Sequence, residues 1–327
     1  MLTLTGADLN LSSLGKFPAA SAAPTTAPTT SVSLALWPCF GAVARAAPER
    51  CAGSVNSSDV VPTPAVAAQI PNAPCDSAHA EGVLYICSFG VPASEAQRTV
   101  VLIGDSHAAM WRAALAPIAR AERWQGISIV HPGCPFNALV RDIGGPQLNA
   151  SCGTWQRAIL PWLDANPQVS EMFVGGLSGS PFIGPPGESN FSAAVAGYRA
   201  VWRRLPANIE HVVVMRDTPR YGSNNMACID RAIAAGEKAG LVCAVPRPVA
   251  ERPDPEVVAA IGMYSPRFES IDVNNEICGP RYCYPVVGGA LVLKDLTHMT
   301  RSFARTLAPA VMAQLRGLMQ GWPEAQR

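Results

Sequence analysis

Ten cysteines constrain this chain more than any other feature of its 327 residues. A reducing cytosol rarely keeps so many cysteines without a metal or redox use, whereas an oxidising compartment pairs them. Taken two at a time along the chain, neighbouring cysteines are 12, 12, 18, 15 and 5 positions apart, and no C-x-x-C pair occurs. The missing pair, together with the lack of histidines at ligand spacing, argues against zinc ribbons and thioredoxin-like redox sites.

Proximity along the chain predicts that each cysteine closes a short loop with its neighbour. The alternative is a set of buried free thiols, which a thiol count on unfolded, unreduced protein would reveal. The predicted pairs are Cys39–Cys51, Cys75–Cys87, Cys134–Cys152, Cys228–Cys243 and Cys278–Cys283.

The charge balance and the short motifs exclude several classes of protein. Charged residues make up 15% of the chain and the net charge is +1, so we expect no nucleic-acid-binding face. No G-x-G-x-x-G and no P-loop occurs, so neither a nucleotide nor another cofactor is indicated. No metal site is predicted either. Hydrophobic residues, at 49% of the chain, are enough to build a sizeable core.

Changes in composition predict three regions. Residues 1–36 form a disordered linker rich in Pro, Ala and Thr, whose clearest part is the tract Pro18–Ser33. Residues 37–98 form an irregular, disulfide-bearing segment, with loops and a short hairpin lying over the main body. Residues 99–327 form the main domain. Neither a signal peptide nor a membrane span is visible, so the chain is either cytosolic or part of a longer exported protein; the cysteines favour the second.

From residue 99 onward, short β-branched runs alternate with helical patterns. This alternation predicts a doubly wound fold, a three-layer α/β/α sandwich with a central parallel sheet and loops stapled by disulfides. Active sites of such folds lie beyond the carboxyl ends of the strands. The expected strands span 99–103, 127–130, 171–174, 211–215 and 270–273, and the expected helices span 107–122, 153–165, 189–204, 227–239, 254–262 and 301–319.

The sequence Gly104-Asp-Ser-His107 follows the first of these strands directly and precedes a helix. Ser106 would therefore lie at the carboxyl end of the strand, near a helix N-terminus whose dipole favours developing negative charge. The alternative is a surface turn in which the serine caps the helix. His107, beside the serine, either takes part in function or supports the turn, and we favour the second interpretation.

A second motif, Asp295-Leu-Thr-His298, precedes the last helix. A histidine can take the proton of a serine hydroxyl at neutral pH, and a carboxylate three residues earlier can bind its other ring nitrogen. The alternative is an exposed Asp and His before a helix cap. The two motifs bracket the α/β body in the order Ser, Asp, His.

Together these motifs resemble the SGNH (GDSL-like) hydrolase superfamily. The resemblance is closest to the SGNH domain that is fused behind the membrane acyltransferase-3 domain in bacterial cell-surface O-acyltransferases, and it covers about residues 37–320. Stretches that support it are Trp37–Val43, Gly104–Trp111, His131–Pro135, Asp217–Pro219, Ile271–Cys283 and Asp295–Thr300.

The resemblance implies a role for each residue of the two motifs. Ser106 would be the nucleophile, His298 the general base and then acid, and Asp295 the residue that orients it. The backbone N–H groups of Ser106 and Gly133 would be donors of the oxyanion hole. The family's third block, G-x-N, has no counterpart in Gly175-Gly-Leu-Ser-Gly179; either Ser178 or a backbone N–H there replaces the asparagine, or the glycines form only a turn.

The resemblance also implies a function and a location. The chain would move an acyl group, with acetyl expected, to or from cell-envelope carbohydrate through an acyl-Ser106 intermediate. It would work outside the cytoplasm, tethered through an upstream membrane domain that supplies the acyl group. The alternative is a catalytically silent domain that binds glycan or scaffolds its membrane partner. Trp111 and Trp155 belong either to the core or to a pocket for sugar or acyl groups.

Overall fold

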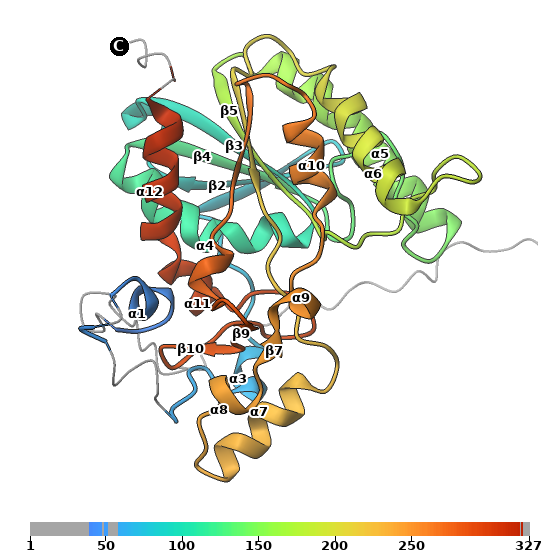
Figure 1. Cartoon of the computed structure of the whole chain (residues 1–327). Helices are drawn as coiled ribbons and strands as arrows, with labels where there is room; N and C mark the ends of the chain where they lie inside the picture. Colours follow the sequence, from blue (N-terminus) through green and yellow to red (C-terminus); the bar gives the residue numbers. More distant parts are fainter. Residues whose placement is uncertain (1–38, 48, 52–57, 321, 323–327) are drawn as a thin grey trace, which may run out of the picture.

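The computed structural model describes residues 39–320, apart from residues 48 and 52–57, and also residue 322. The expected linker over residues 1–36 lies outside these described residues. A sheet of seven strands, in the order β1-β2-β4-β3-β5-β6-β8, forms the centre of the molecule (Figure 1).

Five neighbouring strands of this sheet run parallel to one another. They include the strands expected from the β-branched runs, so the predicted parallel core is confirmed. Their bounds are β3 Arg98–Gly104, β4 Trp124–Val130, β5 Val169–Gly175, β6 His211–Met215 and β8 Phe268–Ile271.

Both faces of the sheet are buried, as the near-continuous apolar runs predict. Along β3, Val100 and Leu102 belong to one buried cluster, whereas Val101 and Ile103 belong to a second cluster on the opposite face. Because side chains alternate along a strand, each face receives its own helical layer. The predicted three-layer sandwich is therefore confirmed. Three helices cover the first face, namely α4 Ser106–Ala121, α11 Arg301–Thr306 and α12 Ala308–Met319, and three cover the second, namely α5 Pro146–Ala165, α6 Asn190–Trp202 and α10 Pro255–Ile261.

The hairpin in the segment before β3 lies elsewhere than expected. Strands β1 (Ser77–Glu81) and β2 (Leu84–Gly90) do not lie over the body but extend the sheet, with β2 antiparallel to β4. Leu84 and Ile86 are buried and join the core, whereas Tyr85 between them is exposed. The sheet is thus mixed rather than purely parallel.

Two expected helices are each divided into two. The segment expected over 227–239 forms α7 (Asn225–Ala234) and α8 (Ala239–Val242), separated at Gly236, whose φ is +67°. The segment expected over 301–319 forms α11 and α12, and Pro309 lies in the first turn of α12, where its missing N–H breaks no helical hydrogen bond.

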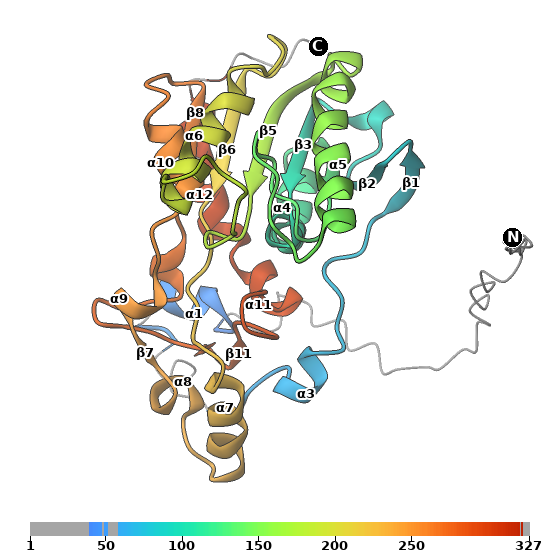
Figure 2. The ribbon, with the colours of Figure 1, turned by 90° about the vertical axis from the view of Figure 1, so that its right-hand side faces the viewer.

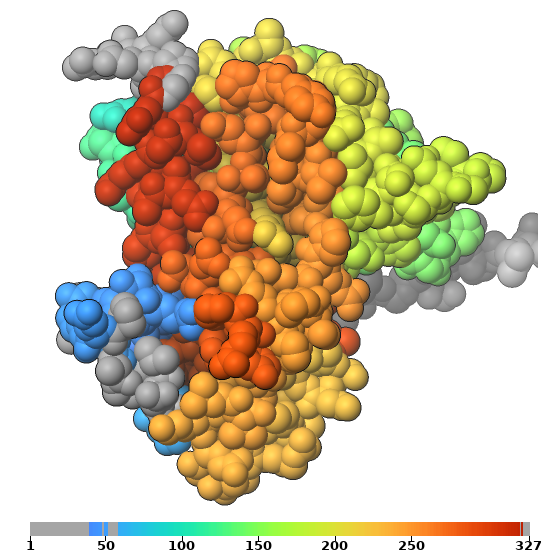
Figure 3. All heavy atoms as spheres, viewed as in Figure 1, coloured from blue at the N-terminus to red at the C-terminus, as the bar shows by residue number. Residues whose placement is uncertain are grey.

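A small lobe lies beyond the end of the sheet toward which the β3 arrow points (Figure 2). It has its own buried cluster, made by α7, α8, α3 (Pro64–Ala67) and the β10–β11 hairpin. Figure 3 shows that the last third of the chain forms the front of the molecule, from α12 down to this lobe. The remaining short elements are α1 Ala42–Ala46, η2 Ala93–Glu95, β7 Val245–Pro246, α9 Arg247–Ala250, η3 Asn274–Glu276, β9 Tyr282–Cys283, β10 Val286–Val287 and β11 Ala290–Leu291.

The structure contains all five disulfides that proximity predicts, and it leaves no cysteine free. One of them, Cys228–Cys243, ties α7 to the segment that follows α8. A second, Cys278–Cys283, closes the turn before β9. The first crosslink restricts the unfolded chain and so stabilises a lobe whose apolar core is small, whereas Cys278 and Cys283 belong to the larger cluster on the first face of the sheet.

Candidate active site

Ser106 is the first residue of α4, at the carboxyl end of β3. The turn that carries it requires glycine at position 104, because a Cβ there would overlap the carbonyl oxygen of Gly175 on the next strand, and its φ is +149°. Asp105 caps the helix and is fully buried; its side chain accepts the N–H of His107 at 2.7 Å. Ser106 therefore lies at the N-terminus of a helix, on a turn that is fixed by the packing of Gly104 against Gly175 and by the Asp105 cap.

The structure brings Ser106 together with the second motif. The Nε2 atom of His298 lies 2.8 Å from the Oγ of Ser106, and its Nδ1 lies 2.9 Å from Oδ2 of Asp295. His298 and Asp295 are 26% and 48% exposed, so the chain of contacts opens to solvent. Burial alone would raise the pKa of Asp295, but hydrogen bonds from His298 and from two backbone N–H groups hold that pKa well below its usual value.

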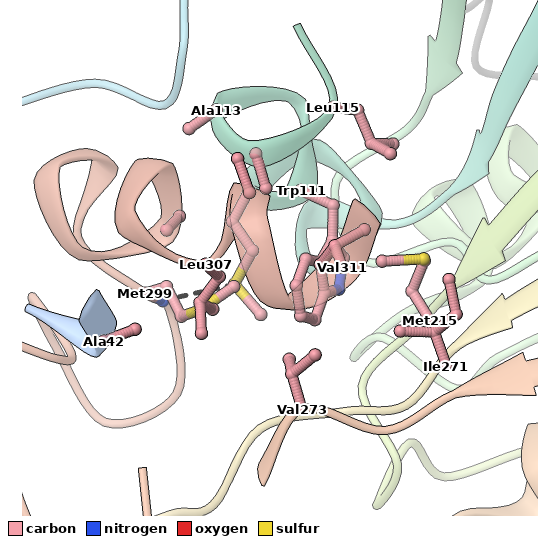
Figure 4. Close-up of a cluster of buried hydrophobic side chains, with 14 of the residues drawn as sticks. Ala42, Trp111, Ala113, Leu115, Met215, Ile271, Val273, Met299, Leu307 and Val311 are labelled. Atoms are coloured by element: carbon pink, nitrogen blue, oxygen red, sulfur yellow. Dashed lines mark hydrogen bonds between the residues drawn. The ribbon is translucent and has the colours of Figure 1, made fainter. Parts of the chain in front are cut away.

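The loop that carries His298 is attached to the core through the next residue, Met299. Met299 is fully buried and its N–H donates to the Sδ of Met110 in α4 at 3.1 Å (Figure 4). The N–H of Lys294 donates to the carbonyl of His298 at 2.9 Å, and Thr300 caps the helix that follows. Because these contacts fix the main chain on both sides, the imidazole is held over α4.

Three residues were expected at the oxyanion hole, and their surroundings differ. Ser106 begins α4, where backbone N–H groups have no acceptor within the helix. Gly133 lies after β4 with a φ of +76°, and its segment is tied to the turn by a hydrogen bond from the His131 N–H to the Gly104 carbonyl, at 3.1 Å. By contrast, the N–H of Ser178 donates to a buried carboxylate, Asp217, and its hydroxyl accepts from an arginine.

A second histidine–aspartate pair lies beside the first, and the sequence analysis did not find it. The Nδ1 of His107 lies 2.6 Å from Oδ1 of Asp217, and each side chain is 2% exposed. The ring of His107 stands 4.9 Å from that of His298, centre to centre. Arg220 contacts the other oxygen of Asp217 at 3.3 Å. The available signal was the position of Asp217 directly after β6, because the carboxyl ends of parallel strands converge at one edge of the sheet.

Further acids are buried behind this pair. Asp254 accepts the backbone N–H of Asp217 at 2.9 Å, and burial raises its pKa to about 6. Burial, together with the charges of Asp254 and Asp105, raises the pKa of Glu256 well above its usual value, and the hydroxyl of Tyr198 bonds to it. The raised pKa favours the protonated form of Glu256, because an unpaired buried charge is costly.

The remaining residues singled out in the sequence are structural. Trp111 and Trp155 are each 1% exposed and belong to the two clusters on opposite faces of the sheet, so both are core residues. Among the described residues, the only group of three or more side chains whose metal-ligand atoms lie close together is Glu251 with Cys278 and Cys283. Both of these sulfurs are in a disulfide, so they offer no thiolate to a metal.

Comparisons with known proteins agree with this fold. The periplasmic domain of a lipopolysaccharide acetyltransferase from Salmonella ser. Paratyphi A superposes with a TM-score of 0.52 at 12% identity, over 70% of this chain and 90% of that one. No curated protein matches this chain. Within the described residues, no helix is both long and apolar enough to cross a membrane.

The family described as the SGNH domain fused to AT3 domains matches residues 74–313. The match includes the β1–β2 hairpin as well as both motifs. It confirms the resemblance on which the site residues were chosen. The chain therefore belongs to the family of SGNH domains that are fused to AT3 domains.

Proposed function

We propose that this protein is a serine-dependent O-acyltransferase or esterase that acts on cell-envelope carbohydrate through an acyl-Ser106 intermediate. The observation that carries the proposal is the unbroken series of contacts from Ser106 through His298 to Asp295. A serine hydroxyl is a weak nucleophile until a base takes its proton, and the base works best when a third group orients it. Ser106 as the nucleophile comes from one part of the chain, and His298 as the base with Asp295 as the orienting group come from another.

The first half of the reaction forms the acyl-enzyme. The Oγ of Ser106 attacks the acyl carbonyl carbon while its proton passes to Nε2 of His298. The resulting imidazolium is stabilised by the ionised Asp295, whose carboxylate accepts a hydrogen bond from the Nδ1–H of His298. When the tetrahedral intermediate collapses, its bond to the leaving oxygen or sulfur breaks, and His298 returns the proton to that leaving group.

The negative charge on the tetrahedral intermediate needs hydrogen-bond donors. In the proposal these are the backbone N–H groups of Ser106 and Gly133. The N–H of Ser178 is already engaged by a carboxylate, so it contributes no donor in this arrangement. Each such donor stabilises the transition state by about 3 kcal/mol. An oxyanion hole with one donor fewer would therefore give a lower kcat.

The second half of the reaction transfers the acyl group. A sugar hydroxyl gives its proton to His298 and attacks the acyl carbon, and the bond to Ser106 Oγ breaks as the proton returns to the serine. If water enters instead, the product is a free acid and the protein is an esterase. Because His298 and Asp295 are partly exposed, an acceptor as large as a glycan can approach them.

The proposed location is outside the cytoplasm, where a membrane-embedded AT3 domain or protein would supply the acyl group. Membership of a family whose SGNH domains are fused to AT3 domains supports this. So do the five disulfides, because oxidising compartments keep such bonds intact. The periplasmic location of the Salmonella domain agrees with the same assignment.

One observation favours a second candidate, a silent domain that binds glycan or scaffolds the membrane partner. The turn after β5 has no asparagine, and the N–H of Ser178 points into the protein. A fluorophosphonate probe separates the two candidates. The enzyme predicts labelling of Ser106 and loss of p-nitrophenyl acetate turnover in Ser106→Ala; an unlabelled protein, or undiminished turnover in that variant, contradicts it. Analysis of products formed with a glycan acceptor then distinguishes transferase from esterase.

A further inference from the structure

The turn after β5, residues 175–179, is held from inside the protein by two carboxylates. The N–H of Leu177 donates to Oδ2 of Asp105 at 3.0 Å, and the next N–H, that of Ser178, donates to Oδ2 of Asp217 at 2.9 Å. Both carboxylates are buried. Hydrogen bonds to an ionised, buried acceptor are about twice as strong as those between neutral groups, so the turn is firmly fixed.

Both carboxylates are connected to the residues that flank Ser106. Asp105 precedes the serine and also caps α4. Asp217 is bound at its other oxygen by Nδ1 of His107, the residue that follows the serine. The nucleophile's two neighbours therefore hold the same turn, one directly and the other through Asp217. Since Gly104 and Gly175 pack backbone against backbone, a shift of this turn would displace the serine.

We propose that His107 and Asp217 are positioning residues for the reaction at Ser106: as a buried pair they lock the turn after β5 against the start of α4. The inference rests on the function proposed above and extends it to a second histidine–aspartate pair. Neither residue receives a proton from Ser106 in this account. Their role is to keep Oγ within reach of His298, because a displacement of about 1 Å can cost roughly 100-fold in rate.

The charges around the pair favour its ionised form. His107 faces Asp217 and Asp105, with Arg220 and the ring of His298 also nearby. Burial alone would lower the pKa of His107, but the attraction of the Asp217 carboxylate outweighs it, and the pKa lies above its usual value.

Asp217 in turn faces two further groups besides His107. Arg220 contacts one of its oxygens, and Asp254 accepts its backbone N–H. The Nε2 atom of His107 is buried and has no partner among the described residues. When His107 gives up a proton, the charge attraction between His107 and Asp217 is lost. The proposal therefore predicts that activity falls at the alkaline end of the pH profile.

The test compares His107→Asn and Asp217→Asn with the wild type in p-nitrophenyl acetate hydrolysis, with His79→Asn on the exposed strand β1 as the matched control. Asparagine at 107 keeps an N–H for Asp217 but carries no charge. We expect kcat to fall by about 10- to 100-fold in both variants, with KM little changed. The alkaline limb of the pH profile should disappear in His107→Asn and move to lower pH in Asp217→Asn, since the anion that raises the pKa of His107 is gone.

The failures of the two proposals can be told apart. If Ser106→Ala keeps its turnover, the proposed function fails whatever His107 does. If Ser106→Ala is inactive while His107→Asn and Asp217→Asn keep the wild-type kcat and pH profile, only the positioning role is overturned. Should these variants not fold, nitrogen NMR of the wild-type imidazoles decides. We expect His107 to keep both ring protons to a higher pH than a free histidine side chain does, and a ring that loses its second proton at or below the usual pH would overturn the inference.

Discussion

Two histidine–aspartate pairs adjoin Ser106, and they differ in both burial and origin. His298 and Asp295 come from one loop, three positions apart, and their side chains are 26% and 48% exposed. His107 lies in the first turn of α4 and Asp217 in the loop after β6, and each side chain is 2% exposed. The same two residue types thus occur once at the solvent boundary and once inside the protein.

The difference teaches that burial decides what such a pair can do. A pair open to solvent can exchange protons with substrate and product, and its contribution to stability is small because water screens the charges. A buried pair cannot reach a substrate, and removing one partner leaves the other charge without compensation. We therefore expect substitutions in the exposed pair to affect activity and substitutions in the buried pair to affect both stability and activity.

The largest expected effect is on activity, in the exposed pair. His298→Ala should lower kcat/KM for p-nitrophenyl acetate by about 10⁴-fold, because Ser106 loses its base. Its urea midpoint should stay near that of the wild type, since the side chain is partly exposed and packs little. A variant that loses activity only in proportion to a loss of folded protein would contradict this division of roles.

The next effect is on stability, in the buried pair. Asp217→Ala should lower the free energy of unfolding by about 3–5 kcal/mol, as expected when one member of a buried ion pair is removed. Burial alone would raise the pKa of Asp217, but His107 and Arg220 hold it near 2. The stability that wild-type Asp217 contributes should therefore be complete between the usual value of 3.8 and the pH at which His107 gives up its proton, and it should be lost as pH falls toward 2. Urea denaturation at several pH values measures it.

A smaller effect should come from the acid behind the pair. Burial raises the pKa of Glu256 well above its usual 4.5, so the wild type loses stability as pH rises from that value toward the pKa in the folded state. Glutamine resembles the protonated acid and does not titrate. The free energy of unfolding of Glu256→Gln should therefore rise relative to that of the wild type as pH increases above 4.5, measured by urea denaturation. A difference that stays constant with pH would contradict a raised pKa.

The smallest effect belongs to an ion pair at the surface. Asp76 and Arg120 lie 2.9 Å apart with side chains 50% and 51% exposed. Asp76→Asn should change the free energy of unfolding by less than about 1 kcal/mol. It serves as the matched control for Asp217→Ala, and a loss as large as that of the buried variant would show that burial is not the deciding factor.

The exposed pair and its serine could be anticipated from the sequence because each of the two motifs consists of neighbouring residues. A strand followed by Gly104-Asp-Ser-His107 places the serine at a strand end, and Asp295-Leu-Thr-His298 needs only one turn to bring its carboxylate to the ring. The disulfides were predictable for the same reason, since each closes a loop of short length. Local spacing carries enough information when the partners are near one another in the chain.

The buried pair was not anticipated, because its partners lie 110 positions apart and share no local motif. A single histidine after a serine and a single aspartate before a threonine each have ordinary structural explanations. Only the sheet order, which places β6 next to β5 and β5 next to β3, brings them together. The β1–β2 hairpin was misplaced for a related reason, since the strand edge that it completes is formed by β4, from a later part of the chain.

The central claim is that Ser106 becomes acylated with His298 as its base. The most direct test is mass spectrometry of peptides from protein quenched in acid during p-nitrophenyl acetate turnover. The account predicts an added acetyl group on the peptide that contains Ser106 in the wild type, and none in Ser106→Ala or His298→Ala. The matched control Ser223→Ala, in an exposed turn, should be acetylated like the wild type. Turnover without acetyl on that peptide, or with acetyl on another residue, would contradict the account.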